Sequence, residues 1–548
     1  MPTNVAPHDI ASSRWRVPFA GRLLIALAIL TSQLVLTPGP SARAEGTLEG
    51  TIVDQDSGAI LPARIYVSNA AGEFFHVTAR QPGQAIPYSV RRSAASLEIH
   101  TTVSATRFQA ALPAGEYQLV AEHGKEYYPA THRFSVRDGA VAELRIPLRR
   151  WINMPQRGWY SGETHSHRSV RETPTLQLAE DLHVSFPLTA WVTDTQQSPA
   201  AASKVRDPLP AAELVEIDET HVFWPINTEY ELFTVRGQAH TLGAFFVLNH
   251  RTPLQLSAPP VSPIAELARQ QGAFLELDKH NWPWSMMIVP RMKVDLFELT
   301  NNHVWRTEFL FKDWYPAYVA EFMQVDMRDG GFTERGWLEF GFRTYYALLN
   351  CGLRMKPTAG TASGVHPVPL GFGRVYVQLG DRFGYDSWCQ GLLAGHSFVT
   401  TGPMLMTEVA RLDDHHVRIT GSLESDSLPT LLEVIINGSV AQSLSPEITR
   451  TPTGACHVPV DLTVPCEGSV WVAVRAWSTA TEGRQRFAHS APVHLPLNDQ
   501  PVRPTRAERD YLVKRVADEL ERNRDFLPAE ALAEYQQSLE FYRALPAR

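Results

Sequence analysis

The chain has 548 residues, of which 44% are hydrophobic and 20% charged, values that are ordinary for globular proteins. This length predicts roughly three or four domains. The net charge is -8 and no run of Lys or Arg forms a basic stripe, which argues against a nucleic-acid-binding protein.

Residues 1–44 have the features of an export signal. Arg14, Arg16 and Arg22 form a positive start, and the apolar run Leu23–Leu36 follows. Ala42-Arg43-Ala44 then matches the A-x-A cleavage pattern. The run is short for a membrane span, and no second long apolar run appears. The sequence therefore predicts a periplasmic or secreted protein with no stable membrane span after cleavage, the alternative being an uncleaved anchor.

Residues 45–150 have an all-β pattern. "GTLEGTIVDQDSGAILPARIYV" alternates apolar residues on both sides of a turn, and "LPAGEYQLVAEH" and "FSVRDGAVAELRIPL" repeat the pattern. Short, regularly spaced strands predict a small β-sandwich. The segment resembles the transthyretin-like or carboxypeptidase-regulatory-like modules that precede many exported enzymes. It has no cluster of catalytic residue types, so we interpret it as a packing or docking module.

Residues 151–405 alternate strand-like and helix-like runs. Thr173-Pro174 predicts the start of a short helix, and "PLTAWVTD" predicts a strand that ends at Asp194. Ser262 is expected to cap a second helix that ends at Gly272, and "AFLELDKH" is the next predicted strand. This alternation favours a parallel sheet or barrel, with the active site at the carboxyl ends of its strands.

The stretch "RGWYSGETHSHRSV" contains the first residues with metal-binding chemistry. His165 and His167 are one residue apart, so in a strand both imidazoles point to the same face, as a shared divalent ion requires. Alone, the pair is equally compatible with two histidines on a solvated strand face. Other polar residues beside or after later predicted strands would meet the pair in a barrel: Asp194, Glu229, His240, Lys279, His280, Asn301, Asn302 and His303.

Residues 406–497 return to short strands and predict a β-rich domain. "LLEVIINGSV" places an Asn437-Gly438 hairpin turn after an alternating run, and "GSVWVAVRAW" is the clearest strand. The four cysteines of the chain match no zinc-ribbon spacing. Cys456 and Cys466 either form a disulfide, which an oxidising compartment permits, or remain buried free thiols.

Residues 498–548 predict a helical hairpin. Thr505 and Glu508 form a capping box at its start. Each helix has one apolar face: Leu512, Val516 and Leu520 on the first, and Leu532, Tyr535, Leu539 and Tyr542 on the second. The hairpin is expected to dock either on the barrel or on a partner.

Taken in order, the blocks of residues 151–405 resemble the PHP-domain metallohydrolases, and among them the CehA/McbA-like group of exported hydrolases. The blocks are "GWYSGETHSHR", "LAEDLHVSFPLTAWVTD", "KHNWPWSMMIVPRMKVDLFELTNNH", "YYALLNCGLRMKPTAGTASGVHPVPLGFGRVYV" and "GHSFVTTGPML". The resemblance implies a multidomain α/β plus β fold. In it, a central distorted (β/α)7 barrel over 151–405 is flanked by the N-terminal β-sandwich, the C-terminal β-domain and the helical hairpin.

The resemblance also implies a cluster of divalent metal ions. His165 and His167 match its first two ligands, Glu229 its bridging carboxylate and His240 a later histidine ligand. We therefore expect zinc, manganese or iron at these four residues, as one ion and at most two.

The sequence departs from the family pattern at four positions. Thr195 stands where the family has a histidine, and Lys279 stands where it has another, with His280 next to it as a substitute. Ala362 and Gly364 replace the carboxylate and histidine of a late motif. These departures leave open whether the site is catalytic.

The leading hypothesis is an exported hydrolase that cleaves ester, carbamate or phosphoester bonds of a small-molecule or glycan-type substrate with a metal-activated water. Lys279 or His280 would stabilise the developing oxyanion or protonate the leaving group, and Asp194 completes the predicted catalytic set. Trp282, Trp284 and Trp305 would either line an apolar pocket or pack in the core. The alternative function is a catalytically inactive PHP-like domain that serves as an extracytoplasmic binding module.

Overall fold

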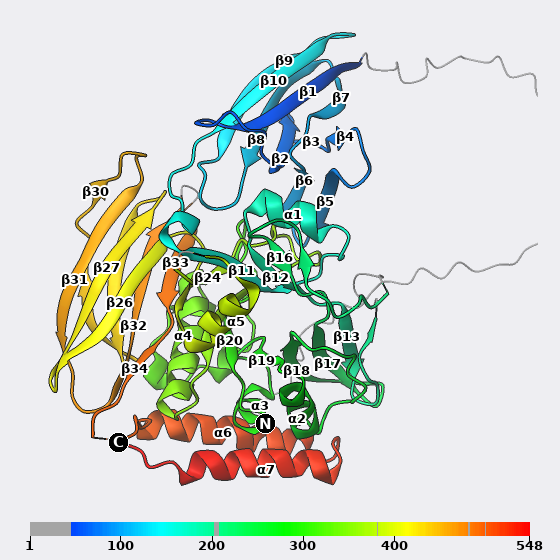
Figure 1. The fold of residues 1–548 in the computed structure, drawn as a ribbon. Helices are drawn as coiled ribbons and strands as arrows, with labels where there is room; N and C mark the ends of the chain where they lie inside the picture. Colours follow the sequence, from blue (N-terminus) through cyan, green and yellow to red (C-terminus); the bar gives the residue numbers. More distant parts are fainter. Residues whose placement is uncertain (1–44, 202–207, 381, 481–482, 499) are drawn as a thin grey trace, which may run out of the picture. The chain divides into compact units, whose positions relative to one another are not determined.

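The computed structural model describes residues 45–201, 208–380, 382–480, 483–498 and 500–548 (Figure 1). The predicted export signal, residues 1–44, lies outside the described residues. Within those ranges, no helix is both long and apolar enough to cross a membrane. The described chain is a strand-rich, mixed α/β structure with several sheets, in agreement with the sequence prediction at this level.

Residues 45–148 form two sheets around a core of their own. One sheet has the strand order β10-β1-β7-β4, and the other has the order β5-β6-β2-β8-β9 with β3 paired to β2. Alternate apolar residues such as Leu48, Ile65 and Leu119 fill the core between them. The strands are β1 (Glu45–Asp54), β2 (Ala63–Asn69), β3 (Phe74–Phe75), β4 (Thr78–Ala79), β5 (Ala85–Arg91), β6 (Leu97–Val103), β7 (Phe108–Pro113), β8 (Gly115–Glu122), β9 (Ala130–Val136) and β10 (Val141–Leu148).

The central region contains strands that alternate with helices. Its strands are β11 (Trp159–Ser166), β12 (Val184–Pro187), β13 (Ala190–Asp194), β14 (Ala200–Ala201), β15 (Val215–Glu216), β16 (Val222–Phe223), β17 (Thr228–Val235), β18 (Gln238–Leu248), β19 (Phe274–Leu277), β20 (Leu296–Thr300), β21 (Met327–Arg328), β22 (Gly331–Phe332), β23 (Lys356–Ser363), β24 (Arg374–Gln378) and β25 (Ser397–Thr400). Its helices are α1 (Thr173–Glu180), α2 (Ser262–Gln270), α3 (Ser285–Met292), α4 (Glu334–Asn350) and α5 (Tyr385–Ala394).

The strand pairings of this region lead back to their starting strand. β11 pairs with β12, and after two residues the same segment continues as β13, which pairs with β17. The pairings then run through β18, β19, β20 and β23 and return to β11. Five of these seven ladders are parallel, and the two that involve β18 are antiparallel. The circuit brings the carboxyl ends of β11, β19, β20 and β23 to one end of the structure.

β18 is antiparallel because a tight hairpin joins it to β17. Val235 pairs with Gln238 across the turn, and Arg236 and Gly237 both have positive φ angles, of 52° and 75°. This turn geometry matches the twist of a two-residue hairpin. β18 therefore begins beside the end of β17, and its first residues extend past the end of β19, whose last residue, Leu277, pairs with Phe245.

Residues 404–495 form two packed β layers. One sheet has the order β26-β27-β31-β30, and the second contains β28, β29 and β32 to β34 and continues into β25 through β33. The predicted Asn437-Gly438 hairpin turn is confirmed, since Ile436 pairs with Ser439. The strands are β26 (Met404–Asp413), β27 (His416–Ser425), β28 (Pro429–Ile436), β29 (Ser439–Leu444), β30 (Thr449–Arg450), β31 (Cys456–Pro465), β32 (Val470–Thr479), β33 (Gln485–Ser490) and β34 (Val493–Leu495).

The proposed disulfide between Cys456 and Cys466 is excluded by the strand that separates them. Cys456 begins β31 and Cys466 directly follows its last residue, so the rise of an extended chain places them roughly 30 Å apart. A disulfide requires Cα atoms within about 7 Å. Both cysteines are buried free thiols, as are Cys351 and Cys389.

The C-terminal hairpin consists of α6 (Arg506–Asn523) and α7 (Ala529–Ala544), which run side by side in Figure 1. The predicted capping box of Thr505 and Glu508 is confirmed. α7 packs on α3, where the hydroxyls of Ser538 and Tyr542 donate to the carbonyls of Met287 and Met286 at 2.9 and 3.0 Å. Of the two docking options, the hairpin therefore takes the central region.

The N-terminus of α2 is capped by a contact that the local sequence does not show. α2 begins at Ser262, but its side chain makes no capping hydrogen bond. Instead, the Glu534 carboxylate of α7 accepts the backbone N–H groups of Val261 and Ser262 at 2.8 and 2.7 Å. The predicted Ser262 cap is thus wrong, because a residue distant in sequence supplies the acceptor.

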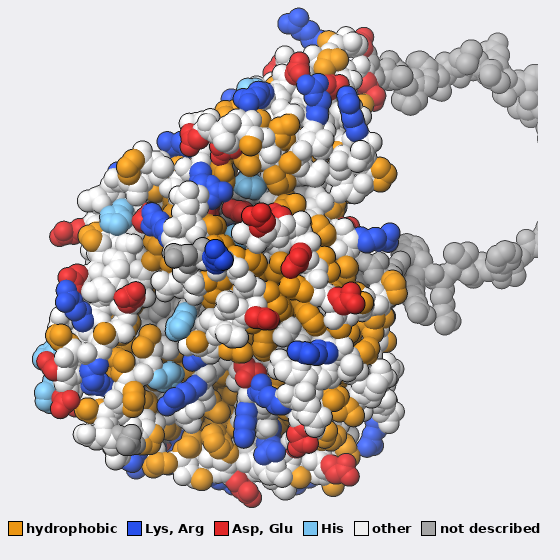
Figure 2. All heavy atoms as spheres, viewed as in Figure 1, with side chains coloured by type: hydrophobic (Ala, Val, Ile, Leu, Met, Phe, Trp, Pro, Cys, Tyr) orange, Lys and Arg blue, Asp and Glu red, His pale blue; other side chains and the backbone are white. Residues whose placement is uncertain are grey.

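Charged side chains of both signs are interspersed on the face seen in Figure 2. Lys and Arg do not gather into one area there, and hydrophobic side chains group in the middle of the face.

Candidate metal centre

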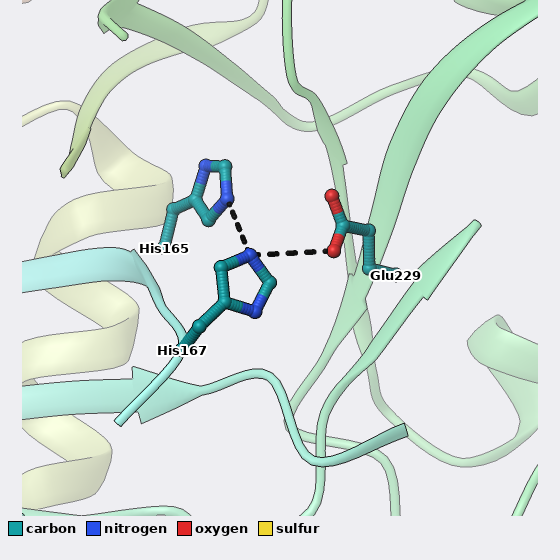
Figure 3. A group of neighbouring side chains, drawn as sticks. All are labelled: His165, His167 and Glu229. Atoms are coloured by element: carbon teal, nitrogen blue, oxygen red, sulfur yellow. Dashed lines mark hydrogen bonds and ion pairs between the residues drawn. The ribbon is translucent and has the colours of Figure 1, made fainter. Parts of the chain in front are cut away.

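Two histidines and one glutamate come together at the end of β11. All eight residues of β11 are buried, because the strand has neighbours along both edges. His165 lies in the strand, and His167 follows it with its N–H donating to the Ser363 carbonyl at 2.8 Å. Glu229, near the start of β17, directs its carboxylate toward both rings (Figure 3).

Two of the three separations between the donor atoms of this group are those of metal ligands, and all three atoms lie within 4.8 Å of one another. The two Nε2 atoms of His165 and His167 are 3.3 Å apart, and His167 Nε2 is 3.5 Å from Glu229 Oε2. Donors around a tetrahedral zinc ion at 2.0–2.1 Å are separated by about 3.3–3.4 Å. The imidazole planes lie at 84° to each other, so that the nitrogens converge rather than run parallel. Three protein ligands also leave a position for water or substrate, as catalytic zinc sites do.

A second layer of carboxylates orients His165 from behind. Its Nδ1 lies 3.0 Å from Glu298 Oε1 of β20 and 3.7 Å from Asp278 Oδ1, which follows β19. Burial, and then the neighbouring Asp278, raise the pKa of Glu298 well above its usual range. A hydrogen bond from Nδ1 to Glu298 leaves the Nε2 lone pair facing His167 and Glu229, the arrangement by which outer carboxylates fix a ligating histidine.

Lys279 lies behind this layer as a buried cation. Its Nζ is 2.5 Å from Asp278 Oδ2, and Trp282 Nε1 donates to the same oxygen at 2.9 Å. Lys279 is 2% exposed, so its charge is poorly screened by water. Trp282, together with Trp284 and Trp305, belongs to the buried core, which favours the packing interpretation of these tryptophans.

His280 points away from the metal-ligand group into aromatic packing. Its ring contacts Phe297, Trp337 and Phe340, and neither ring nitrogen has a partner among the described residues. Burial, and then the charges of Arg515 and Lys279, lower the pKa of His280 to about 3. His280 therefore does not lie beside His165, His167 and Glu229, where a substitute ligand would have to be. Lys279 and His280 are successive residues, so their side chains leave the strand end in different directions.

The structure places Asp194 in a hydrogen-bonded turn. One carboxylate oxygen accepts from Thr234 Oγ1 at 2.6 Å and from the Gly237 N–H at 2.7 Å, while the other accepts from the Gln196 N–H at 2.9 Å. These bonds tie the end of β13 to the β17–β18 turn. Asp194 is not brought together with the histidines, and its local role is structural.

His240 is also separated from the other predicted ligands. Phe246 is the residue of β18 that pairs with Glu229, so His240 lies six residues, or roughly 20 Å, further along the strand. Its Nε2 is 2.7 Å from Asn523 Oδ1, and its ring stacks on Phe526 at 4.0 Å. Because the β17–β18 hairpin extends past Glu229 to its turn at Val235 and Gln238, a histidine expected at the site contacts the C-terminal helices instead.

The segment Gly360–Gly364 supports the site with its backbone. A Cβ on Gly360 would lie closer than 3.0 Å to both Glu298 and His165, and one on Gly364 would overlap the His167 backbone. The Thr361 N–H donates to Glu163 at 2.8 Å. Gly360 and Gly364 therefore lie where the chain must approach His165 and His167 closely.

Glu298 and Asp278 were not among the predicted site residues. Glu298 lies inside the apolar strand "LFELT", where a carboxylate is unusual, and Asp278 comes directly before Lys279 at a predicted strand end. A buried carboxylate in an apolar strand requires a partner, which here is His165. The sequence alone therefore offered a reason to expect Glu298 in a functional site.

A second cluster, Asp181, His183 and His221, has metal-binding residue types but a different geometry. The two imidazoles stack almost parallel at 9°, so their lone pairs do not converge. Asp181 already has a cation beside it, since Arg150 Nη2 is 3.5 Å from its Oδ2. His221 lies between Asp181 at 3.5 Å and Asp218 at 2.9 Å, which suits an ion-pair network better than a metal site.

We expect this network to stabilise the fold below neutral pH. Although burial opposes it, the Asp181 and Asp218 carboxylates raise the pKa of His221. A raised folded-state pKa gives stability that is complete below the unfolded value of about 6.5 and is lost as the pH rises through the folded value. His221→Gln should therefore lower Tm by about 1–2 °C more at pH 5.5 than at pH 9.

Thermal denaturation of the variant at both pH values tests this prediction. His416→Gln is the matched control, because His416 has the same spacing and a 2.9 Å contact with Asp413 but is 44% exposed. An equal Tm loss for His221→Gln at both pH values would contradict the ion-pair assignment.

No protein-family model matches the chain, and no curated protein matches it. One solved structure is a two-domain protein from Bacteroides vulgatus containing a predicted PHP-like metal-dependent phosphoesterase. It has 10% identity, covers 62% of this chain and 95% of its own, and has a TM-score of 0.27. The C-terminal domain of the shaft pilin SpaA from Lactobacillus rhamnosus GG has 16% identity, covers 19% and 98%, and has a TM-score of 0.13.

Proposed function

We propose that the chain is a metal-dependent hydrolase in which His165, His167 and Glu229 hold one divalent ion. The observation that carries the proposal is the convergence of three buried donor atoms at 3.3 and 3.5 Å, with a carboxylate behind His165. Zinc, manganese and iron all accept imidazole together with a carboxylate. A bound ion of this kind supplies Lewis acidity and an acidified water, the chemistry required to hydrolyse an ester, carbamate or phosphoester.

The other roles in the proposed reaction are those of side chains around the metal ligands. Glu298 holds His165 in one tautomer and one orientation. Lys279, a buried cation paired with Asp278, would stabilise negative charge developing on the substrate. Asp194 and His280 take no part in this mechanism, because the first is bonded within a turn and the second is packed among aromatic rings.

The closed circuit of ladders supports a distorted PHP-type barrel as the fold of this region. The sequence blocks quoted above support membership of the CehA/McbA-like group. The features of residues 1–44 support export, so the proposed hydrolase acts in the periplasm or outside the cell on a small-molecule or glycan-type substrate.

The proposal is tested by metal content and turnover measured on the same preparation. The expected result is close to one equivalent of zinc, manganese or iron, with hydrolysis of at least one of three probes: p-nitrophenyl acetate, a p-nitrophenyl carbamate and p-nitrophenyl phosphate. Dialysis against a chelator should remove the metal and the activity together, and re-addition should restore both. Less than about a tenth of an equivalent, unresponsive to added metal, would refute the proposal.

The alternative, an inactive binding module, is favoured by one observation: Ala362 and Gly364 provide no ligands where the family pattern has two. It predicts that none of the three probes turns over, whether or not a metal binds. Turnover therefore separates the two functions.

A further inference from the structure

Strand β5 of the N-terminal module contacts the segment that follows β23. The Tyr88 hydroxyl accepts the Gly364 N–H at 3.0 Å and donates to the His366 carbonyl. Arg92, which directly follows β5, donates from Nη2 to the Val365 carbonyl at 2.7 Å. Three successive residues of the central region are therefore each hydrogen-bonded to a residue of the N-terminal module.

The same part of the chain holds the main chain of His167. The Ser363 carbonyl accepts the His167 N–H at 2.8 Å. A Cβ on Gly364 would lie 2.3 Å from the His167 carbonyl oxygen, so the two backbones are in close contact. Gly364 also has a φ of 112°, which residues with a side chain rarely adopt. Residues 363–364 therefore fix the main chain from which the His167 imidazole extends.

Tyr88 also contacts the residue that follows His167. The guanidinium of Arg168 lies 3.9 Å from the centre of the Tyr88 ring, and its Nε donates to Ser363 Oγ at 3.1 Å. Tyr88 and Arg168 are each 5% exposed and Ser363 is fully buried, so little water is present to replace these contacts. Tyr88 thus bonds to the segment beside His167 through its hydroxyl and stacks on the next residue through its ring.

Other contacts hold the N-terminal module on the central region without the Tyr88 hydroxyl. Arg306 pairs with Glu122 of β8 at 2.9 Å and with Glu98 of β6 at 3.3 Å. Arg64 of β2 pairs with Glu180 of α1. None of these pairs includes a metal ligand or a residue of 363–366. Removal of this one hydroxyl is therefore expected to leave the module docked and to act locally.

We propose that Tyr88 is a positioning residue of the metal centre, supplied by the N-terminal module. It fixes residues 363–366 and the residue that follows His167. The His167 Nε2 atom thereby stays 3.3 and 3.5 Å from the donor atoms of His165 and Glu229. The inference rests on the proposed function, because it concerns the same metal ion. It gives the module, which the sequence indicates only as a packing or docking unit, a part in the site.

The test compares metal binding by the wild type and by Tyr88→Phe, which loses the hydroxyl and keeps the ring. Competitive titration measures the zinc affinity, and the visible absorption of bound Co²⁺ reports the geometry of its ligands. We expect the variant to bind zinc about tenfold more weakly, the lower end of the loss caused by removing an outer partner of a ligand. Its Co²⁺ bands should also change in position and intensity. Neither readout requires turnover.

Tyr117→Phe is the matched control. Tyr117 is also 5% exposed and belongs to the N-terminal module, but its hydroxyl donates to the Pro113 carbonyl of the same module at 2.7 Å. This variant should bind zinc and Co²⁺ as the wild type does. The inference alone is overturned if the wild type binds zinc but Tyr88→Phe behaves no differently from Tyr117→Phe. If the wild type itself binds neither ion, the proposed function fails, and the inference fails with it.

Discussion

Replacing His167 with alanine is expected to abolish both metal binding and hydrolysis. His167 Nε2 is the one donor within 3.5 Å of both other ligands, so its loss leaves two donors that no longer enclose an ion. Loss of an outer partner of a ligand already costs about 10- to 100-fold in affinity or activity. We therefore expect metal occupancy below about a tenth of an equivalent and a fall in kcat/KM greater than about 100-fold, measured by elemental analysis and steady-state kinetics.

His240→Ala is the control for this variant. It removes a histidine that the sequence placed in the ligand set and that the structure places against Asn523 and Phe526. Metal content and kcat/KM should remain at the wild-type level. If His240→Ala loses the metal while His167→Ala retains it, the site is assigned to the wrong residues.

Gly360→Ala is expected to disturb the site without removing any ligand. The added Cβ would overlap Glu298 and the base of the His165 side chain, both of which are fixed by packing. Overpacking of this kind costs about 1–3 kcal/mol of folding stability. Because the displaced groups are a ligand and its orienting carboxylate, metal affinity should fall by about 10- to 100-fold. Chemical denaturation and a competitive metal titration measure the two effects.

Gly115→Ala controls for the general cost of adding a methyl group. Gly115 lies at the start of β8, and the nearest atom to its Cβ position is 3.8 Å away on Tyr117. This variant should change neither stability nor metal affinity measurably. Wild-type metal affinity in Gly360→Ala would show that the glycine does not support His165.

The sequence predicted those side-chain positions of the proposed site that depend on local spacing. The one-residue separation of His165 and His167 is enough to place two imidazoles on one face once a strand is assumed. Glu229 came from the order of blocks, and the structure brings it to the same point. The hairpin turn at Asn437-Gly438 was predictable for the same reason, because two adjacent residues determine it.

The remaining parts depend on contacts between distant segments. His240 was misplaced because the sequence does not show that β18 folds back on β17. His280 and Lys279 are neighbours in the sequence, but their surroundings differ, because His280 packs against Phe340 and Lys279 pairs with Asp278. Glu298 stands out as a carboxylate inside an apolar strand, but the sequence does not show what it contacts, because its partner His165 lies 133 residues earlier in the chain.

The most direct test of the central claim is anomalous diffraction from crystals of the protein grown with zinc. The prediction is one peak between His165 Nε2, His167 Nε2 and Glu229 Oε2, about 2.0–2.2 Å from each donor. A peak at Asp181, His183 and His221 instead, or a fully occupied ion that contacts neither His165 nor His167, would contradict it.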